Sequence, residues 1–227
     1  LDPFPMLAPG AANSAVMVAL LFVEGRRVQA RLRGDLEDER LSAARTPLEA
    51  GRVIVAAADE MFGWDACTLE TISETEDRQR TILMMDLIDG QRIELPSAPS
   101  DQEITPLRRE IMTHGTRLMQ NDSGRHAPGT TPFGDTTRPS ASLLFAPIRH
   151  GVRVLGVLSI QSYSKGAYAE QNLELFQTLA NFCGAALERI RMEEALRESE
   201  RRFRELLEQV RLVGVMLDHE GRVTFCN

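Results

Sequence analysis

The chain has 227 residues, 43% of them hydrophobic and 26% charged, so it can bury a core and does not have the composition of a disordered segment. Its net charge of −7, with arginines scattered among acidic residues, argues against a nucleic-acid surface. Cys67, Cys183 and Cys226 are odd in number and lack CxxC or Cys/His spacing. The cysteines therefore predict free thiols in a reducing, cytoplasmic setting, with no zinc site and no disulfide framework.

Residues 1–35 differ in pattern from the rest and are treated as a separate N-terminal segment. An uninterrupted apolar run at 15–23 is followed by several arginines. A bilayer span needs about 20 apolar residues, so this run is too short unless residues 7–14 are added. Two interpretations stay open, the remnant of a membrane anchor and an element of a preceding domain. We expect the sequence to be a piece of a longer protein.

Residues 36–62 have apolar positions at helical spacing. Thr46, Pro47 and Glu49 form a helix-start signal, with Thr46 as N-cap and Pro47 in the first turn. Gly63 predicts the end of this helix, because glycine favours the conformation that follows a last helical turn.

Alternating or apolar runs predict six strands, at residues 66–72, 80–88, 91–95, 116–119, 142–148 and 152–161. A short helix is predicted at 106–114, closed by Gly115. Residues 121–141 contain little apolar sequence and predict a long loop. A loop of this length within a compact domain is unusual and tends to be functional or mobile.

A long helix is predicted from residue 169 to about 210. Its apolar positions follow two heptad-like frames, which we interpret as a dimeric, signalling coiled coil. The first frame contains Leu173, Phe176, Ala180, Cys183, Leu187 and Ile190. The second contains Met192, Leu196, Ser199, Phe203, Leu206 and Val210. The six-residue step from Ile190 to Leu196 shifts the phase near 191–195, as a stutter does, and we interpret this as a bistable element.

The order of elements predicts an α+β fold, an antiparallel sheet sandwiched by helices with a long C-terminal helix. Residues 36–190 resemble the GAF domain family. The resemblance is carried by "APIRHGVRVLGVLSIQSYSKGAYAEQNLELFQTLANFCGAALERI" at 146–190, above all by "GVLSI" and "NLELFQTLA". It implies a sensory module of a multidomain signalling protein, such as a histidine kinase or a diguanylate cyclase.

Residues 191–212 are then predicted to be a helical linker. Residues 213–227 resemble the opening of a PAS domain, with two strands around the turn from Asp218 to Gly221. This segment is too short to close a PAS core. The resemblance implies a downstream PAS or other output domain in the same chain.

No phosphate loop, nucleophile elbow or zinc-protease motif is present, so no catalytic residue is predicted. No cofactor is evident, and the patterns expected of bilin, cyclic-nucleotide or haem sites are not seen. The candidate ligand residues border the expected cavity between the sheet and the long loop, and their other interpretation is ordinary core. They are Trp64, Thr68, Met84, Leu118, Phe133, Phe145 and Tyr163.

Three functions remain in view. The first is a sensory module that binds a small molecule or a partner and relays a change through a homodimeric C-terminal helix. The second is a ligand-free dimerisation spacer. The third is a redox enzyme such as a methionine sulfoxide reductase, which would need reactive cysteines in the cavity. Nucleic acid is not an expected partner, and a membrane is expected only through an N-terminal anchor.

Overall fold

The computed structural model describes residues 40–73, 77–96, 102–209 and 215–226, so the N-terminal apolar run at 15–23 lies outside the described residues. The chain divides into two compact units, the second of which begins at Glu188. Within the described ranges, no helix has both the length and the apolar character needed to cross a bilayer.

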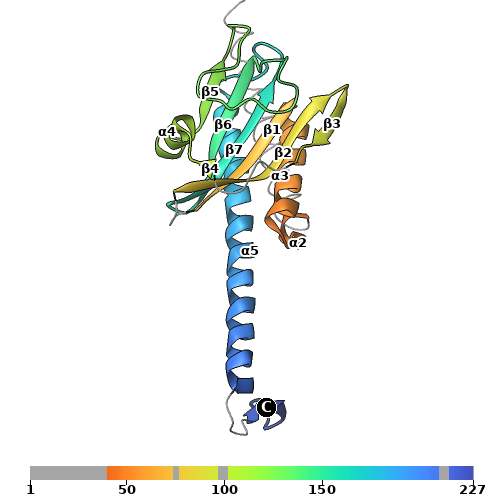
Figure 1. Ribbon diagram of the computed structural model, residues 1–227, viewed down its shortest axis with the longest axis vertical. Helices are drawn as coiled ribbons and strands as arrows, with labels where there is room; N and C mark the ends of the chain where they lie inside the picture. The colour runs from red at the N-terminus through yellow and green to blue at the C-terminus, as the bar shows by residue number, and fades with distance from the viewer. Residues whose placement is uncertain (1–39, 74–76, 97–101, 210–214, 227) are drawn as a thin grey trace, which may run out of the picture. The chain divides into compact units, whose positions relative to one another are not determined.

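The first unit is built on a seven-stranded antiparallel sheet, and the predicted α+β class is confirmed (Figure 1). The strand order is β3-β2-β1-β7-β6-β5, with β4 paired to β2. The strands are β1 (Ala66–Ser73), β2 (Arg78–Ile88), β3 (Gln91–Glu94), β4 (Gln102–Glu103), β5 (Arg117–Gln120), β6 (Ser142–His150) and β7 (Arg153–Ser162). Only the two-residue β4 was missing from the sequence prediction.

The helices are α2 (Leu41–Ala43), α3 (Pro47–Phe62), α4 (Pro106–His114) and the long α5 (Asn172–Gln209), whose first part belongs to this unit. Two of them begin at a capping threonine, α3 after Thr46 and α4 after Thr105. At the start of α3 the Thr46 hydroxyl accepts a hydrogen bond from the Glu49 N–H at 3.2 Å. The helix restart that the sequence predicts at Thr46 and Pro47 is therefore confirmed, because Thr46 is extended and Pro47 begins α3.

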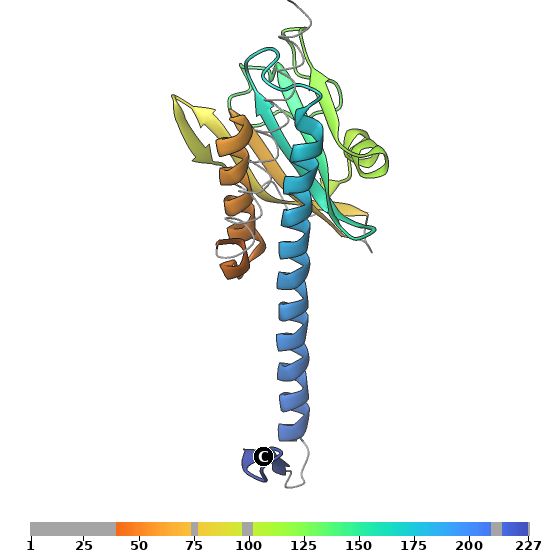
Figure 2. The same ribbon diagram turned by 180° about the vertical axis from the view of Figure 1, so that it is seen from behind.

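One face of the sheet is covered by α3 and the N-terminal part of α5 (Figures 1 and 2). The rings of Phe62 and Phe176 meet edge to face, with centroids 5.7 Å apart. Gly51 of α3 lies over Leu69 and Leu83, the residues that β1 and β2 present to this helix. This face therefore forms one half of the core.

The opposite face carries α4 and the loop of residues 121–141. Leu107 and Ile111 of α4 pack with Leu143 and Phe145 of β6 in a buried cluster that also includes Ala127 from the loop. Each of these five side chains is at most 5% exposed. The loop is thus part of the second half of the core.

Helix α5 is continuous through the predicted phase shift, but its two apolar frames have different environments. The first frame is buried within a single chain apart from the half-buried Leu173. The interpretation of residues 173–190 as a dimer seam stays a prediction. In the second frame, Met192, Leu196, Phe203 and Leu206 are 54–62% exposed. On an ideal helix the two frames point about 150° apart.

The second unit contains the rest of α5 and a two-stranded hairpin, β8 (Val215–Leu217) and β9 (Val223–Cys226). Asp218 orders the turn, since its carboxylate accepts hydrogen bonds from the N–H groups of Glu220 and Arg222, both at 2.9 Å. The two strands match the expected ones at 213–227. Their assignment to a PAS domain stays a prediction.

Candidate ligand pocket under the 121–141 loop

The loop of residues 121–141 is folded by its own hydrogen bonds, although it contains no helix or strand. The Asn121 side-chain amide donates to the carbonyls of Arg125 and Ser140, at 2.6 and 2.9 Å. Asp135 accepts from both the N–H and the hydroxyl of Thr137. The loop therefore has a defined shape that can form one wall of a site.

Asp86 of β2 fastens this loop to the sheet. Its carboxylate is fully buried. One oxygen accepts a hydrogen bond from the Asp135 N–H at 2.7 Å. The other accepts from the Leu87 N–H at 2.8 Å and from the Tyr163 hydroxyl. Three donors thus stabilise this buried carboxylate, and it forms no salt bridge with the residues that the structure describes.

The Tyr163 phenol remains a donor to Asp86 over the physiological pH range. Burial, followed by the hydrogen bond to Asp86 and its charge, raises the pKa of Tyr163 well above its ordinary value. The guanidinium of Arg138 lies over the Tyr163 ring, 4.1 Å from the ring centroid. This places a cation from the loop directly on the ring that Asp86 orients.

Gly134 allows the close approach between loop and strand. Its φ is +64°, a region that glycine adopts readily. A Cβ atom at this position would overlap the Asp86 carboxylate. The Asp86–Asp135 contact therefore requires glycine here for both its backbone conformation and its missing side chain.

A pocket lies between the loop and the ends of β1, β6 and β7. Its volume is about 20 Å³, enough for one or two water molecules. Loop residues form most of the wall: His126, Ala127, Thr130, Thr131, Pro132, Phe133, Asp135, Arg138 and Ser140. The sheet side is formed by Ala66, Leu143, Gln161 and Tyr163. The lining is mainly polar, and it holds one cationic group, Arg138.

The structure brings two of the seven predicted ligand residues, Phe133 and Tyr163, into this pocket. Strand register places Thr68, Met84 and Phe145 on the same face of the sheet, but they do not line the pocket. The Thr68 hydroxyl is instead hydrogen-bonded to that of Ser159 at 2.8 Å, in the buried interior.

Leu118 lies on the other face of the sheet. It pairs with Leu144, which pairs with Ile160. The pocket residues Leu143 and Gln161 pair with each other one position along the same strands. Because side chains alternate along a strand, a shift of one residue moves Leu118 to the face that carries α5. Its neighbour Met119 packs on the α4 cluster instead.

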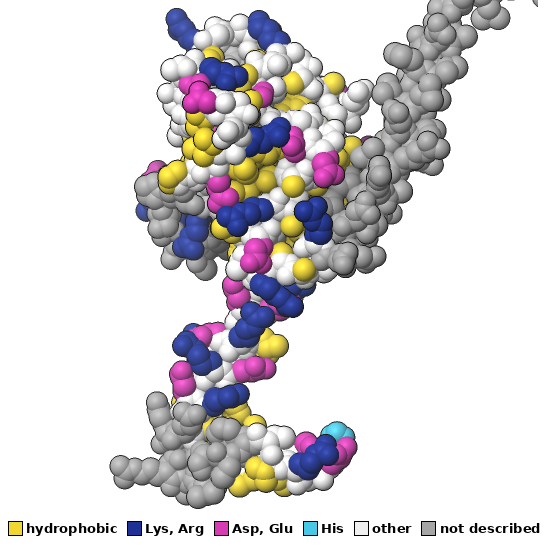
Figure 3. All heavy atoms as spheres, turned by 90° about the vertical axis from the view of Figure 1, so that its right-hand side faces the viewer, with side chains coloured by type: hydrophobic (Ala, Val, Ile, Leu, Met, Phe, Trp, Pro, Cys, Tyr) yellow, Lys and Arg dark blue, Asp and Glu magenta, His cyan; other side chains and the backbone are white. Residues whose placement is uncertain are grey.

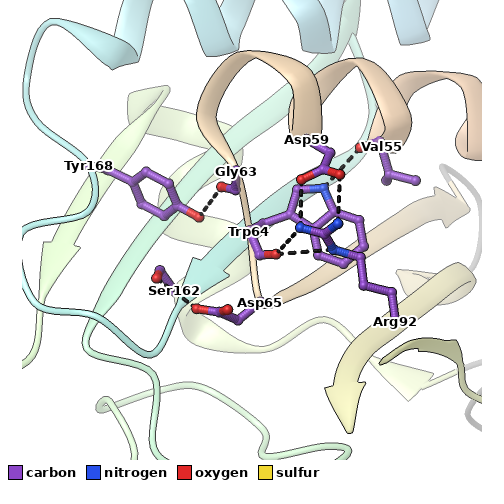
Figure 4. Close-up of polar contacts among 8 residues, drawn as sticks. All are labelled: Val55, Asp59, Gly63, Trp64, Asp65, Arg92, Ser162 and Tyr168. Atoms are coloured by element: carbon purple, nitrogen blue, oxygen red, sulfur yellow. Dashed lines mark hydrogen bonds and ion pairs between the residues drawn. The ribbon is translucent and has the colours of Figure 1, made fainter. Parts of the chain in front are cut away.

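The Trp64 side chain is held by protein contacts just after the end of α3 and does not line the pocket (Figure 4). Its indole N–H donates to the Val55 carbonyl at 2.9 Å. Arg92 stacks on the ring at 4.4 Å from the centroid and forms a bidentate ion pair with Asp59, at 2.6 and 2.7 Å. Asp65 next to it accepts hydrogen bonds from the Ser162 hydroxyl and the Tyr163 N–H. Trp64 thus fixes the helix-to-strand junction.

The sequence prediction missed Asp86, Gly134, Arg138 and Gln161. Asp86 offered a signal, since it is the one charged residue within the otherwise apolar run from Ile82 to Ile88. A charge in a buried strand needs partners, and this marks it as a candidate functional or organising residue. The other three are polar or small residues whose position depends on long-range contacts.

The two cysteines with described side chains, Cys67 and Cys183, are buried outside the pocket. Burial raises the pKa of each thiol from its ordinary value of 9.0 to about 12. Each thiol is therefore protonated at neutral pH and a poor nucleophile. In the described ranges, no cluster of three or more His, Cys, Asp or Glu side chains could hold a metal ion.

Residues 44–188 match the GAF domain family, and the chain belongs to it. The match covers more than half of the chain and ends next to the boundary between the two units. The resemblance given by the sequence motifs is therefore confirmed for this part. No curated protein sequence matches the chain significantly.

Solved structures share the fold at low sequence identity. The GAF domain of a phosphoenolpyruvate-protein phosphotransferase from Coxiella burnetii is 17% identical, with a TM-score of 0.56 over 75% of this chain and 98% of that one. A free methionine-R-sulfoxide reductase from Neisseria meningitidis is 17% identical, with a TM-score of 0.54 over 74% and 91%. A methyl-accepting chemotaxis protein segment is 12% identical, with a TM-score of 0.53 over 73% and 99%.

Proposed function

We propose that the chain is a sensory GAF module that binds a small molecule under the 121–141 loop and relays the change through a dimeric α5. The observation that carries the proposal is the attachment of the loop to the sheet by Asp86. A loop that contacts β2 through a buried carboxylate has a closed arrangement that a ligand can stabilise or release, which is the requirement for a two-state element. The occurrence of this fold in a chemotaxis protein agrees with a sensory role.

A chain of contacts leads from the pocket toward α5. Ala127 lines the pocket and packs in the cluster with Ile111 of α4. The Met112 carbonyl, one residue on, accepts a hydrogen bond from the Arg149 guanidinium at 2.8 Å. The backbone of Arg149 in turn lies against Gly184 of α5. Movement of the loop can therefore displace α4, and α4 can displace the helix.

A second connection joins the end of α4 to α5. The Gln177 side chain donates to the Pro147 carbonyl at 2.9 Å and accepts from the Thr116 hydroxyl at 2.7 Å. Thr116 lies between α4 and β5. Helix α5 is therefore held at two points, at Gln177 by Thr116 and Pro147 and at Gly184 by the Arg149 backbone. We infer that rotation or sliding of α5 about these two contacts carries the signal.

The second apolar frame of α5 supports dimerisation through residues 192–206. Four large apolar side chains on one stripe are more than half exposed, which is costly unless a partner covers them. Arg and Glu side chains intermix along this part of the helix (Figure 3) and form pairs within the same chain, such as Arg202–Glu198 and Arg197–Glu193. A second copy, with the same stripe, is the proposed occupant.

A regulatory role is proposed in preference to an enzymatic one. The sulfoxide reductase option would need a reactive thiol at the pocket. Both described thiols lie outside it and are held protonated, which supports a non-catalytic module.

The alternative proposal is a ligand-free dimerisation spacer. The observation in its favour is the pocket volume of about 20 Å³, far below the roughly 300 Å³ typical of drug-sized ligand sites. In this case Asp86 would hold the loop closed permanently. The module would then transmit nothing from the pocket.

A thermal-shift screen of small metabolites separates the two proposals. The sensory proposal expects at least one compound to raise the melting temperature, because saturation at 100 times Kd adds about 2.7 kcal/mol to stability. Thr131→Trp, which fills the pocket from an exposed position, should abolish that shift. Arg125→Trp is the matched control, since Arg125 is exposed in the same loop but does not line the pocket. If no compound raises the melting temperature of the wild-type chain, the spacer is favoured.

A further inference from the structure

We propose that the pocket takes a small carboxylate, bound through Arg138 and Gln161. This inference rests on the proposed function and specifies the chemistry of its ligand. It comes from hydrogen-bond donors on the pocket wall that the protein itself does not use.

The Arg138 guanidinium is the first of these donors. It lines the pocket and stacks on the Tyr163 ring, which fixes its plane while leaving its N–H edge open. Among the described residues it forms no hydrogen bond or salt bridge, although its charge helps to lower the pKa of Asp135, after the Thr137 hydrogen bonds. The neighbouring loop residues Asp135 and Ser140 are hydrogen-bonded. A stacked guanidinium with a free edge is suited to the two oxygens of a carboxylate.

The Gln161 side chain supplies the second donor. It is 9% exposed and lines the same pocket from β7. Its carbonyl oxygen accepts a hydrogen bond from the Ser140 hydroxyl at 2.7 Å, which orients the amide. The amide nitrogen then has no partner among the described residues and borders the pocket. A ligand oxygen at this point of the pocket would accept a hydrogen bond from the amide in place of water.

The acidic groups near the pocket do not cancel this preference. The oxygens of Asp86 accept from three protein donors, and Asp135 accepts two hydrogen bonds from Thr137. The Thr137 contacts, through its hydroxyl and N–H, hold the pKa of Asp135 below its ordinary value. The Asp86 carboxylate is thus used by the protein on both oxygens, whereas Asp135 receives both of its hydrogen bonds on one oxygen and has Arg138 as a nearby positive charge.

The volume restricts the group that enters. A space of about 20 Å³ holds one or two water molecules, so a small carboxylate enters it only with a movement of the loop. We therefore take formate, acetate, propionate and succinate as probes, with acetamide, propionamide and succinamide as uncharged counterparts. Inorganic phosphate serves as a second anion.

The experiment is a titration followed by NMR of the whole chain, observing the Gln161 side-chain amide and the Arg138 Nε–H. We expect at least one carboxylate to shift both signals in a saturable way and to bind at least tenfold more tightly than its amide. Arg138→Gln should weaken that binding about tenfold or more. Arg125→Gln removes the same charge from an exposed position of the same loop outside the pocket, and it should leave binding unchanged.

Four results would overturn the carboxylate assignment. They are equal binding of amides and carboxylates, binding that survives Arg138→Gln, binding of phosphate alone, and no saturable shift from any carboxylate. In each case a hit in the metabolite screen that Thr131→Trp abolishes keeps the sensory function standing. A screen without hits, together with no shift here, would overturn both proposals.

Discussion

Gly134 and Asp86 make the contact on which the loop depends, and a single methyl group tests it. Gly134→Ala introduces a left-handed alanine and a clash with the buried carboxylate. We expect a loss of about 2–4 kcal/mol of unfolding free energy, the sum of backbone strain and a displaced hydrogen bond to a charge. Gly124 in the same loop has φ +67° and open space around it. Gly124→Ala should therefore cost only about 1 kcal/mol; equal losses in urea denaturation would contradict the Asp86 attachment.

The buried thiols predict an alkaline loss of stability. Cys67 and Cys183 have a folded-state pKa of about 12 against an ordinary value of 9.0. Above pH 9 the unfolded chain releases these protons while the folded chain keeps them, so stability falls as pH rises toward 12. Each thiol contributes at most about 1.4 kcal/mol per pH unit. Urea midpoints from pH 8 to 10 should fall less steeply for Cys183→Ala than for the wild type, and parallel curves would refute the assignment.

Residue-level signals in the sequence were reliable where the chemistry is local. Thr46, Pro47 and Gly63 act within a few positions of one another, and the structure confirms the start and end of the helix that they predict. The contact between Asp86 and Tyr163 spans 77 positions, so no local pattern reveals it. The pocket could be predicted only as a location between loop and sheet, because its donors depend on such long-range contacts.

Among the elements, α4 carries two neighbouring arginines that form ion pairs with residues outside the helix. The two pairs differ in how far they are buried. Arg108 forms a bidentate pair with Glu70, and both side chains are 8% exposed. Arg109 pairs with Asp77, where the side chains are 52% and 65% exposed. Arg108→Met should cost about 3–5 kcal/mol, because it leaves Glu70 buried without its partner.

Arg109→Met is the matched control, in the same helix with the same kind of pair, and it should change stability little because solvent screens that pair. Replacing both Glu70 and Arg108 by methionine should recover most of the loss, since no charge then stays buried. Equal denaturation midpoints for the two single variants would show that burial does not set the strength of these pairs.

Gly184 tests the contact between α5 and the sheet. In an open helix, glycine to alanine would stabilise by about 1 kcal/mol. Here a Cβ atom would overlap the Arg149 backbone, so we expect Gly184→Ala to destabilise by about 1–3 kcal/mol. Ala185→Gly on the exposed side of the same turn should cost about 1 kcal/mol by propensity alone. A stabilised Gly184→Ala protein would mean that α5 is not held closely at this point.

The helix α5 also shows where sequence periodicity stops being informative. Its existence and length were predicted closely, because nearly forty residues with helical spacing leave little alternative. The heptad pattern did not reveal which partner each frame meets. Residues such as Ala180 and Cys183 pack within their own chain, while Leu196 and Phe203 remain exposed. Both frames have the same spacing, and only the tertiary structure separates them.

Over the whole molecule, the proposed function requires one continuous helix between the candidate pocket and the proposed dimer stripe, and α5 is continuous. The pocket and both helix contacts, Gln177 and Gly184, lie in the first unit. The exposed stripe of residues 192–206 lies in the second. Such a molecule should lose dimerisation without losing its pocket when the stripe alone is changed.

The most direct test is native mass spectrometry of the whole chain taken from the lysate of the cells that express it. The account predicts a dimer in which each chain carries a small bound mass. Phe203→Glu should give a monomer that keeps the mass, and Thr131→Trp a dimer that lacks it. A wild-type chain that is monomeric, or dimeric with no bound mass in any charge state, would contradict the central claim of a dimeric ligand sensor.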